Sequence, residues 1–370
     1  MLGARAPMSR EDDGPAPVLV SVRAHLRPRG LGGGTEVDVA PTTGPLIDRY
    51  GRVHDDLRLS LTDRCNLRCV YCMPEEGVSF LPREELLSAD ELVRLAQVAH
   101  ELGVKSLRLT GGEPLVRRGV VTLVRRLADV GFDDIALTTN ATKLADLAGP
   151  LADAGLKRVN VSCDSLREER FASIRRRGVL KNVLAAMDEA ERVGLRPLKV
   201  NVVMVRGRND DEIVDFARFA RDTGRLVRFI EFMPLDAQGE WGSDRVVSGR
   251  EIVEKIHTVW PLSPVDEPLR VAPAERFVFD DHQGEIGVIS SVTQPFCGTC
   301  NRLRVTAEGS VRNCLFSDDE NSLRDVLRSG GTDDEIAQLL RRAVWAKYPG
   351  HAINEPSFLR PRRSMSMIGG

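Results

Sequence analysis

The sequence has no long hydrophobic run, no strong net charge and no apolar leader. No stretch approaches the eighteen or so uninterrupted apolar residues of a membrane-spanning helix, and the opening residues MLGARAPMSREDDGPAP hold acidic residues where a signal peptide has its apolar segment. Fifty-two Lys and Arg residues oppose 54 Asp and Glu residues, so no overall field attracts the chain to nucleic acid or to a membrane. The sequence predicts a cytoplasmic, globular protein with no nucleic-acid or membrane partner.

Cysteine is present, but its distribution does not suit a disulfide framework. The seven cysteines of the 370-residue chain are an odd number and fall into two tight groups and one isolated residue, Cys163. Disulfides are rare in a reducing compartment, where clustered cysteines more often bind metal. We therefore expect two metal sites, and we expect Cys163 to be a small buried hydrophobic residue.

Strands and helices alternate along most of the chain. Residues 1–45 are rich in Gly, Pro and Arg and lack an apolar period, which predicts a flexible N-terminal extension. Beyond them, Ser88 and Glu91 form a capping box before the first helix. The predicted strands are LRLSL, SLRLT, DIALTT, RVNVS, LKVNVV and LVRFIEF, and the predicted helices lie near residues 88–102, 119–130, 144–154, 178–193 and 210–222.

This alternation predicts an α/β fold. Strands separated by helices pair in parallel through right-handed crossovers, and six such units form an incomplete, open (βα)6 TIM-like barrel, which we assign to residues 46–240. Residues 241–370 contain two hairpin-like segments, RFVFDDHQGEIGVISS and RLRVTAEGSVRNCLF. We expect these segments to belong to a smaller C-terminal α+β region that closes the open side of the barrel.

The first thiol group, Cys65, Cys69 and Cys72, has the spacing C-x3-C-x2-C and directly follows the first predicted strand. It therefore lies at the C-terminal end of that strand, on the active face of such barrels. A zinc site needs a fourth ligand, and the only nearby histidine, His54, precedes the strand. The alternative is a [4Fe-4S] cluster with three thiolate ligands and one open iron. The spacing alone leaves both alternatives open.

The second thiol group, Cys297, Cys300 and Cys314, has the spacing C-x2-C-x13-C. A hairpin that starts at residues 303–307 would return Cys314 to the Cys-x2-Cys loop. A zinc ribbon needs a second pair of ligands, and no such pair accompanies Cys314. This group therefore predicts a second cluster with an open iron.

Several cations occupy positions inside predicted strands. Arg58, Arg108 and Lys199 interrupt the first, second and fifth strands, where burying a positive charge is costly. Arg302 and Arg304 are two residues apart on one strand and therefore face the same side, beside the second thiol group. The alternative for each of the five is a side chain that extends to solvent.

The remaining charged and titratable residues show no catalytic arrangement. Lys181 and Arg175 to Arg177 fall in charge-rich helical stretches, a pattern typical of solvated faces. The six histidines are scattered, and we expect them to have structural roles. No acid–base dyad or Ser-His-Asp constellation competes with the thiol groups.

The first thiol group, with Tyr71 directly before its last cysteine, resembles the signature of radical S-adenosylmethionine (SAM) enzymes. In that family three cysteines hold a [4Fe-4S] cluster and SAM chelates the fourth iron. The segment RLTGGEP, residues 108–114, is similar to the family segment that meets the methionine amino group of SAM. The resemblance assigns SAM binding to Tyr71, Gly111, Gly112, Glu113, Ser162 and Met233.

The two thiol groups together resemble those of the GTP 3',8-cyclase family, which begins molybdenum cofactor biosynthesis. The similarity extends from Leu46 to Gly370 and includes LTDRCNLRCVYCMP, LTGGEPL, LTTN, RFIEFMP, FCGTCNRLR and IGG. It implies a lyase that uses two [4Fe-4S] clusters and SAM to convert GTP to (8S)-3',8-cyclo-7,8-dihydroguanosine 5'-triphosphate. The resemblance places the guanine ring near the open iron of the second cluster. It assigns GTP binding to Arg58, Arg108, Thr138, Lys199, Arg302 and Arg304.

The resemblance also implies a mechanism and partners. A one-electron reductant such as flavodoxin reduces the first cluster, SAM is cleaved to methionine and a 5'-deoxyadenosyl radical, and that radical takes hydrogen from C3' of GTP, after which C3' attacks C8 of guanine. The product passes to cyclic pyranopterin monophosphate synthase, and the enzyme is a homodimer. Gly369 and Gly370 reach into the barrel near the substrate and are needed for catalysis.

One residue departs from the family pattern. Ala141 follows Asn140 where the family has glycine, and because a methyl group disfavours positive φ, we expect this loop to differ slightly. Two alternatives to a cyclase stay open. A radical SAM enzyme that modifies a peptide would have more cysteines in its C-terminal region and no need for phosphate-binding arginines in its interior. A zinc protein without enzymatic activity would use both thiol groups as structural sites.

Overall fold

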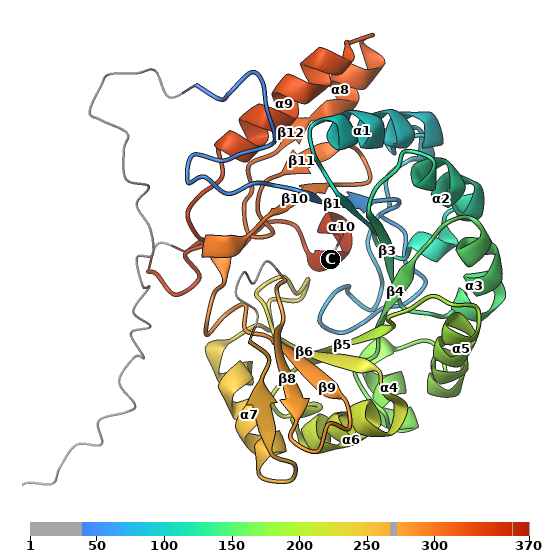
Figure 1. Cartoon of the computed structure of the whole chain (residues 1–370), viewed down its shortest axis with the longest axis vertical. Helices are drawn as coiled ribbons and strands as arrows, with labels where there is room; N and C mark the ends of the chain where they lie inside the picture. Colours follow the sequence, from blue (N-terminus) through green and yellow to red (C-terminus); the bar gives the residue numbers. More distant parts are fainter. Residues whose placement is uncertain (1–38, 267–271, 357, 370) are drawn as a thin grey trace, which may run out of the picture.

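The structure is a computed structural model that describes residues 39–266, 272–356 and 358–369 (Figure 1). Most of the predicted N-terminal extension, residues 1–38, lies outside the described residues. Six strands pair in parallel, each with the next along the chain, so the prediction of six parallel strands is confirmed. They are β1 (Asp56–Ser60), β2 (Ser106–Thr110), β3 (Asp134–Thr139), β4 (Arg158–Ser162), β5 (Lys199–Met204) and β6 (Leu226–Glu231).

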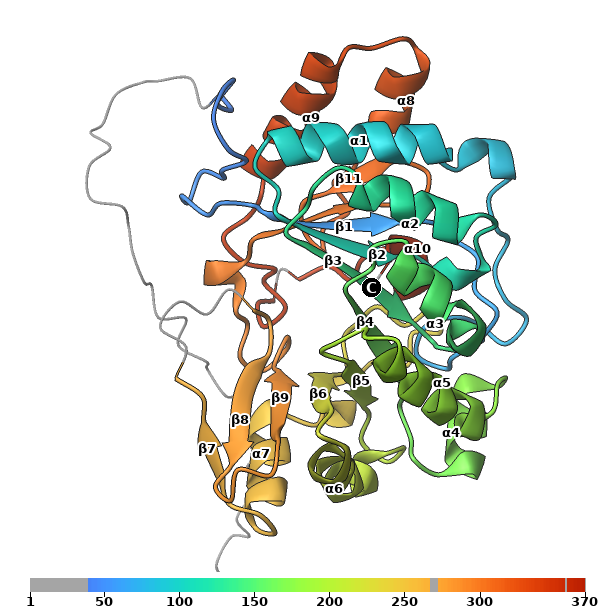
Figure 2. The same ribbon diagram turned by 45° about the vertical axis from the view of Figure 1, so that its right-hand side comes forward.

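Helices cover the outer face of this curved sheet (Figures 1 and 2). Five lie at the predicted positions: α1 (Ala89–Glu101), α2 (Val120–Ala128), α3 (Leu144–Asp153), α5 (Leu180–Arg192) and α6 (Ile213–Thr223). The capping box of α1 is confirmed, because Ser88 Oγ accepts from Glu91 N at 3.2 Å while the Glu91 carboxylate accepts from Ser88 N at 2.7 Å. One helix, α4 (Glu168–Arg175), was not predicted and precedes α5.

The C-terminal region extends the sheet on both sides. β10 (Arg302–Val305) pairs in parallel with β1, and β9 (Glu285–Ile289) pairs in parallel with β6. The two predicted hairpins are present as β8 (Glu275–Phe279) with β9 and as β10 with β11 (Ser310–Arg312). The sheet has the order β12-β11-β10-β1-β2-β3-β4-β5-β6-β9-β8-β7, with β7 (Leu262–Pro264) and β12 (Asn321–Ser322) at its ends. Its first and last strands do not pair among the described residues, so the barrel is incomplete, as predicted.

The remaining helices are α7 (Gly249–His257), α8 (Leu323–Arg328), α9 (Asp333–Trp345) and α10 (Met365–Ile368). α7, α8 and α9 lie on the outside, whereas α10 lies inside the curve of the sheet (Figure 1). Among the described residues, no helix is long and apolar enough to cross a membrane.

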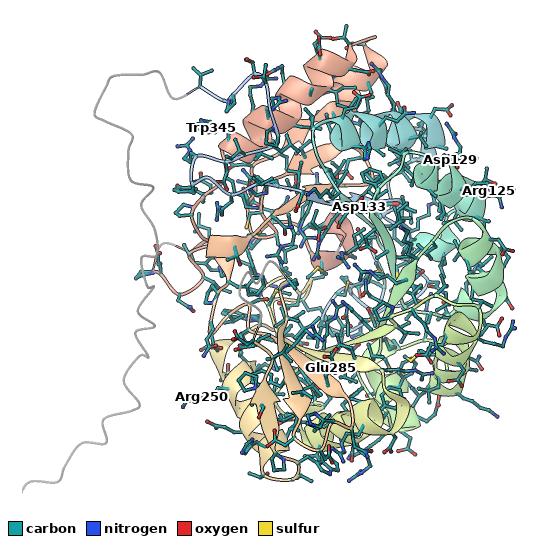
Figure 3. The ribbon with its side chains drawn as sticks, in the orientation of Figure 1. Arg125, Asp129, Asp133, Arg250, Glu285 and Trp345 are labelled. Carbon is teal, nitrogen blue, oxygen red and sulfur yellow. The ribbon has the colours of Figure 1, made fainter. Side chains whose placement is uncertain are left out.

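The two faces of the sheet have opposite character because side chains alternate along each strand. Leu57, Leu107 and Leu303 are side by side in the register and are buried toward the helices. The next row, Arg58 with Arg108 on one side and Arg304 on the other, faces the interior of the curve. Charged residues of the outer helices, such as Arg125 and Arg250, instead point to solvent (Figure 3). The interior of the barrel is therefore polar and the layer under the helices is apolar.

Candidate functional site

A cavity of about 430 Å³ lies inside the curve of the sheet. Its walls come from all six parallel strands, from β10, from the loop after β1 and from α10. Most of the residues predicted from the sequence line this one space: Arg58, Cys65, Cys69, Tyr71, Cys72, Arg108, Gly111, Gly112, Glu113, Thr138, Ser162, Lys199, Met233, Arg302 and Arg304.

The loop after β1 carries the first thiol group into the cavity. It forms a tight turn, in which Cys72 N and Met73 N both donate to Cys69 O at 2.9 and 3.0 Å. Burial raises the pKa of Cys69 to about 11 and also raises the pKa values of Cys65 and Cys72. Since thiolates bind iron, metal binding must release these protons.

The donor set fits an iron–sulfur cluster better than a single ion. Among the described residues, no three Cys, His, Asp or Glu side chains converge closely enough to hold one metal ion. In a cluster each cysteine binds a different iron, so the three sulfurs need not converge on one point. The first thiol group, in which Cys69 is buried while Cys65 and Cys72 are partly exposed, lines the cavity and is compatible with that arrangement.

Gly111 and Gly112 let the end of β2 pack directly against the cysteine loop. A Cβ at Gly111 would lie 2.4 Å from Thr62 O, and one at Gly112 would lie 2.4 Å from Arg64 O. Gly112 N donates to Thr62 O at 2.8 Å, in the close approach that these glycines permit. The two glycines therefore set the distance between the first thiol group and the segment predicted to bind SAM.

Glu113 is held in place by three donors of the protein. Its carboxylate accepts from Leu115 N at 3.0 Å, Thr139 Oγ1 at 2.8 Å and Asn140 N at 2.6 Å, and burial raises its pKa. Ala141, which follows Asn140 in the chain, has a φ of 63°. Ala141 therefore adopts the positive φ that we expected its methyl group to disfavour, and its N–H donates to Thr139 Oγ1 at 2.9 Å. The hydrogen bonds of this loop offset the strain that the methyl group introduces.

The hairpin of β10 and β11 brings the second thiol group together. Burial raises the pKa of Cys297, and the neighbouring thiols of Cys314 and Cys300 raise it further. Burial also disfavours the Cys300 thiolate, but Arg302 and Lys347 outweigh it and lower the pKa of Cys300 to about 6. Lys347 Nζ lies 3.3 Å from Cys300 Sγ. These three cysteines do not line the cavity themselves, although their chain neighbours Asn301, Arg302 and Leu315 do.

Cations crowd the part of the cavity between the two thiol groups. Burial and nearby Arg304 lower the pKa of Arg58, and burial lowers the pKa of Arg304 to about 10. Burial and neighbouring arginines lower the pKa of Lys199 to about 7. Arg108 Nη2 lies 3.4 Å from Asp56 Oδ2. Among the described residues, Asp56 is the only carboxylate within ion-pair distance of the cations predicted to bind GTP.

Three further cations that line the cavity lie on strands and were not predicted from the sequence: Arg158, Arg228 and Arg276. Arg158 donates through Nε to Asp134 Oδ1 at 2.8 Å. Arg228 donates to Asn201 Oδ1 at 2.9 Å and to Asn160 Oδ1 at 3.0 Å, and burial lowers its pKa to about 9. The sequence does mark these three residues, because each lies in a strand, where burying a positive charge is as costly as it is at Arg58.

The tail enters the barrel beside β1 and β10. Arg304 Nη1 donates to Gly369 O at 2.9 Å, and Ser60 Oγ donates to Ile368 O at 3.2 Å. Gly369 has φ of 79°, and a Cβ there would lie 2.0 Å from Ser60 Oγ, so glycine is required. Gly370 lies outside the described residues.

One prediction about charge is wrong. Arg175 does not lie on a solvated face: its side chain is 3% exposed and its Nη2 lies 2.8 Å from Asp164 Oδ2. The reason is that α4 ends beneath the cysteine loop, where Arg68 N donates to Arg175 O at 3.3 Å. Arg177, in contrast, is exposed as predicted.

Cys163 is fully buried, which confirms the expectation that it is a small buried hydrophobic residue.

The fold and the first thiol group define a radical SAM enzyme. Residues 59–220 match the family model described as Radical SAM superfamily, and residues 226–353 match the one described as Molybdenum Cofactor Synthesis C. The fold is similar to that of native anSMEcpe with bound AdoMet, with a TM-score of 0.53 and 13% identity over 80% of this chain and 82% of that chain. It is also similar to Streptococcus suis SuiB bound to S-adenosylmethionine, with a TM-score of 0.51 and 15% identity over 86% of this chain and 75% of that one.

Two curated relatives identify the particular family. The GTP 3',8-cyclase 2 of Mycobacterium tuberculosis (strain ATCC 25618 / H37Rv) is 48% identical over 338 residues, which are 90% of this chain and 94% of that protein. The GTP 3',8-cyclase of Corynebacterium glutamicum (strain ATCC 13032) is 46% identical over 336 residues, or 88% and 89% of the two chains. The chain belongs to the GTP 3',8-cyclase family, which decides against the peptide-modifying enzyme and the non-enzymatic zinc protein.

Proposed function

We propose that this enzyme is a GTP 3',8-cyclase, which binds SAM at an iron–sulfur cluster and cyclises GTP in the first step of molybdenum cofactor biosynthesis. The observation that carries the proposal is that a single cavity joins the first thiol group to a set of buried cations. The thiol group suits a cluster and SAM, and the cations suit a triphosphate. The two reactants would therefore meet in one enclosed space, which protects a radical from water.

The first thiol group and the residues around it hold the cluster and SAM in this proposal. When bound, the cluster supplies the electron that cleaves SAM and so generates the radical. Glu113 cannot turn freely, since it accepts three hydrogen bonds, and it therefore presents a fixed negative charge to the methionine amino group. Gly111 and Gly112 hold that charge against the cysteine loop. Tyr71, Ser162 and Met233 line the adjoining wall.

The buried cations bind the triphosphate. Arg58 Nε and Arg108 Nε are buried without a hydrogen-bond partner among the described residues, so both side chains retain unused donors. Desolvation makes such charges costly until an anion arrives. Each charge-assisted hydrogen bond to phosphate then contributes about 1.5 to 3 kcal/mol. Lys199 and Thr138 line the same wall, and Arg158, Arg228 and Arg276 add further positive charge to it.

The second thiol group holds a second cluster that binds the guanine ring. Support comes from Cys300, whose pKa of about 6 makes it a thiolate at neutral pH and therefore ready to bind iron. Arg302 and Arg304 extend from this group into the cavity and would hold GTP with its base toward the open iron. The tail contacts Arg304 and so lies where it would confine the ribose near the radical.

The partners of the reaction are proposals that follow from the family. We expect a one-electron reductant such as flavodoxin, transfer of the product to cyclic pyranopterin monophosphate synthase, a homodimer, and a cytoplasmic location. Sedimentation of the cluster-loaded protein tests the dimer, because a monomer at micromolar concentration would contradict it.

The test of the proposed function is anaerobic turnover. The reconstituted chain, given SAM, GTP and dithionite, should form 5'-deoxyadenosine and the cyclised nucleotide in equal amounts. Iron should approach eight atoms per chain. Replacing the second thiol group by Ala should halve the iron and stop cyclisation while SAM cleavage persists, whereas loss of SAM cleavage in that variant would contradict the separate roles of the two groups.

A further inference from the structure

We propose that Lys347 is a positioning residue of the second cluster: its buried ammonium donates to the Cys300 sulfur, balances the negative charge of the cluster and raises its reduction potential. This role rests on the proposed function, because it requires a cluster at the second thiol group. It goes beyond that function, since Lys347 does not line the cavity and acts on the reaction only through the cluster.

Lys347 lies between the second thiol group and strand β10. It follows the end of α9 by two residues and is only 4% exposed. Its Nζ lies 3.3 Å from Cys300 Sγ and donates to Arg302 O at 2.9 Å. One ammonium therefore contacts both a predicted cluster ligand and the first residue of the strand that extends from this ligand into the cavity.

The ammonium of Lys347 has no carboxylate to balance its charge. Among the described residues its hydrogen bonds go only to Cys300 Sγ and Arg302 O, and no Asp or Glu side chain lies within ion-pair distance of it. Burying an ammonium without an opposite charge is costly. A cluster held by three thiolates is an anion, and its reduction adds a further negative charge. The cluster is therefore the group that can balance this buried lysine.

The backbone next to Lys347 is fastened to the second thiol group. Arg52 donates to Cys297 O at 2.7 Å, and the same guanidinium donates to the carbonyl groups of residues 348 and 349 at 2.8 and 3.0 Å. A single arginine thus joins the loop that carries Cys297 to the two residues that follow Lys347. This connection keeps the lysine beside Cys300, because the ammonium cannot move to solvent without displacing the fastened segment.

The contact with sulfur determines the direction of the effect. Hydrogen bonds to the sulfurs, net charge and solvent exposure set the potential of an iron–sulfur cluster. Here the donor is a cation within hydrogen-bond distance of a ligand sulfur, and its burial removes the water that would screen the charge. Its attraction is stronger for the reduced cluster, which is the more negative state. Lys347 therefore favours reduction.

The reduction potential of the second cluster tests this role. In a background with the first thiol group replaced by Ala, the remaining cluster is titrated with dithionite in the presence of redox mediators, and its reduced form is followed by electron paramagnetic resonance. Lys347→Met removes the charge and the donor, and it should lower the equilibrium constant for reduction about tenfold, which is about 59 mV for one electron. Lys347→Arg keeps both and should retain most of the potential. Lys347→Gln keeps a donor without the charge and should give an intermediate potential.

A matched control and the conservative variants separate this role from a structural one. Lys181→Met makes the same change at an exposed lysine of α5 and should leave the potential unaltered. If Lys347→Met fails to bind iron, the comparison of Lys347→Arg with Lys347→Gln decides, since both can still donate to Cys300 and the arginine variant should have the higher potential. Equal potentials for Lys347→Met and Lys181→Met, or for Lys347→Arg and Lys347→Gln, would overturn the inference. Absence of iron from the background itself would instead refute the second cluster of the proposed function.

Discussion

Lys199 gives the proposed substrate site a pH dependence that can be measured. This first residue of β5 lines the cavity near Arg228, Arg158 and Arg108. Burial and then these cations lower its pKa from 10.5 to about 7. In the free protein at pH 8 the side chain is therefore mostly a neutral amine. A triphosphate reverses the local charge and restores the proton. Binding of GTP at pH 8 should therefore take up close to one proton.

The magnitude and its sign follow from linkage. Well below pH 7 Lys199 is protonated in both the free protein and the complex, so it adds no pH dependence to the affinity. Above pH 7 the complex binds more protons than the free protein, and the affinity falls by up to about tenfold per pH unit, or 1.36 kcal/mol. The fall ends at the raised pKa of Lys199 in the complex. Lys199→Met should weaken binding about ten- to a hundredfold at pH 6.5, where the full charge is lost.

Calorimetry of GTP binding measures the proton directly. The cluster-loaded protein, without reductant, is titrated between pH 6.5 and 8.0 in buffers of different ionisation enthalpy, so that the pH stays about one unit or more below the pKa of about 9 of Arg228. Lys199→Arg is the matched control, since a guanidinium keeps its proton in this range, and it should abolish the uptake while retaining affinity. Zero uptake at pH 8 by the unmodified protein, or full uptake by Lys199→Arg, would refute the reasoning.

Three further outcomes are expected. Replacing the first thiol group by Ala should halve the iron and abolish SAM cleavage, measured as 5'-deoxyadenosine, and persistent cleavage would contradict its role. Arg304→Ala should weaken GTP binding about ten- to a hundredfold with both clusters retained, because it removes a charge-assisted contact, and calorimetry showing unchanged affinity would contradict this. Removing Gly369 and Gly370 should leave iron content, thermal stability and uncoupled SAM cleavage nearly intact while cyclisation falls by orders of magnitude, because the radical is no longer directed. An unaltered ratio of cyclised product to 5'-deoxyadenosine would mean that the tail has no such role.

The strands and the cations that face the cavity could be predicted because both depend on local rules. Alternation along a strand places Arg58 and the residues two positions away on one face, and the cost of burying a charge marks that face as a binding surface. The same rule also marks Arg158, Arg228 and Arg276, because all three lie inside strands. Arg175 could not be found in this way, since its burial depends on how α4 packs beneath a loop a hundred residues earlier in the sequence.

Two further features could not be predicted from the sequence. They are the positions of the C-terminal strands and the conformation of Ala141. β10 pairs with β1 across more than two hundred residues, and nothing in either segment specifies this partner. The intrinsic preference of alanine predicts a negative φ at Ala141, whereas hydrogen bonds fix the loop: Thr139 Oγ1 accepts from Ala141 N and Asn140 Oδ1 accepts from Thr142 N. The domain boundary predicted near residue 240 stays a prediction, although the two family models meet earlier, between residues 220 and 226.

The pairing of β10 with β1 and of β9 with β6 has a consequence for how the chain can be divided. A fragment that ends after β6 would leave unpaired backbone along both outer strands of its sheet, and exposed strand edges recruit other chains. Such a fragment should aggregate when produced alone, and a C-terminal fragment supplied separately should rescue its solubility only if added during refolding. The radical SAM segment and the molybdenum cofactor segment would then unfold in one cooperative transition. Neither segment could be exchanged for that of another protein without unpairing the sheet.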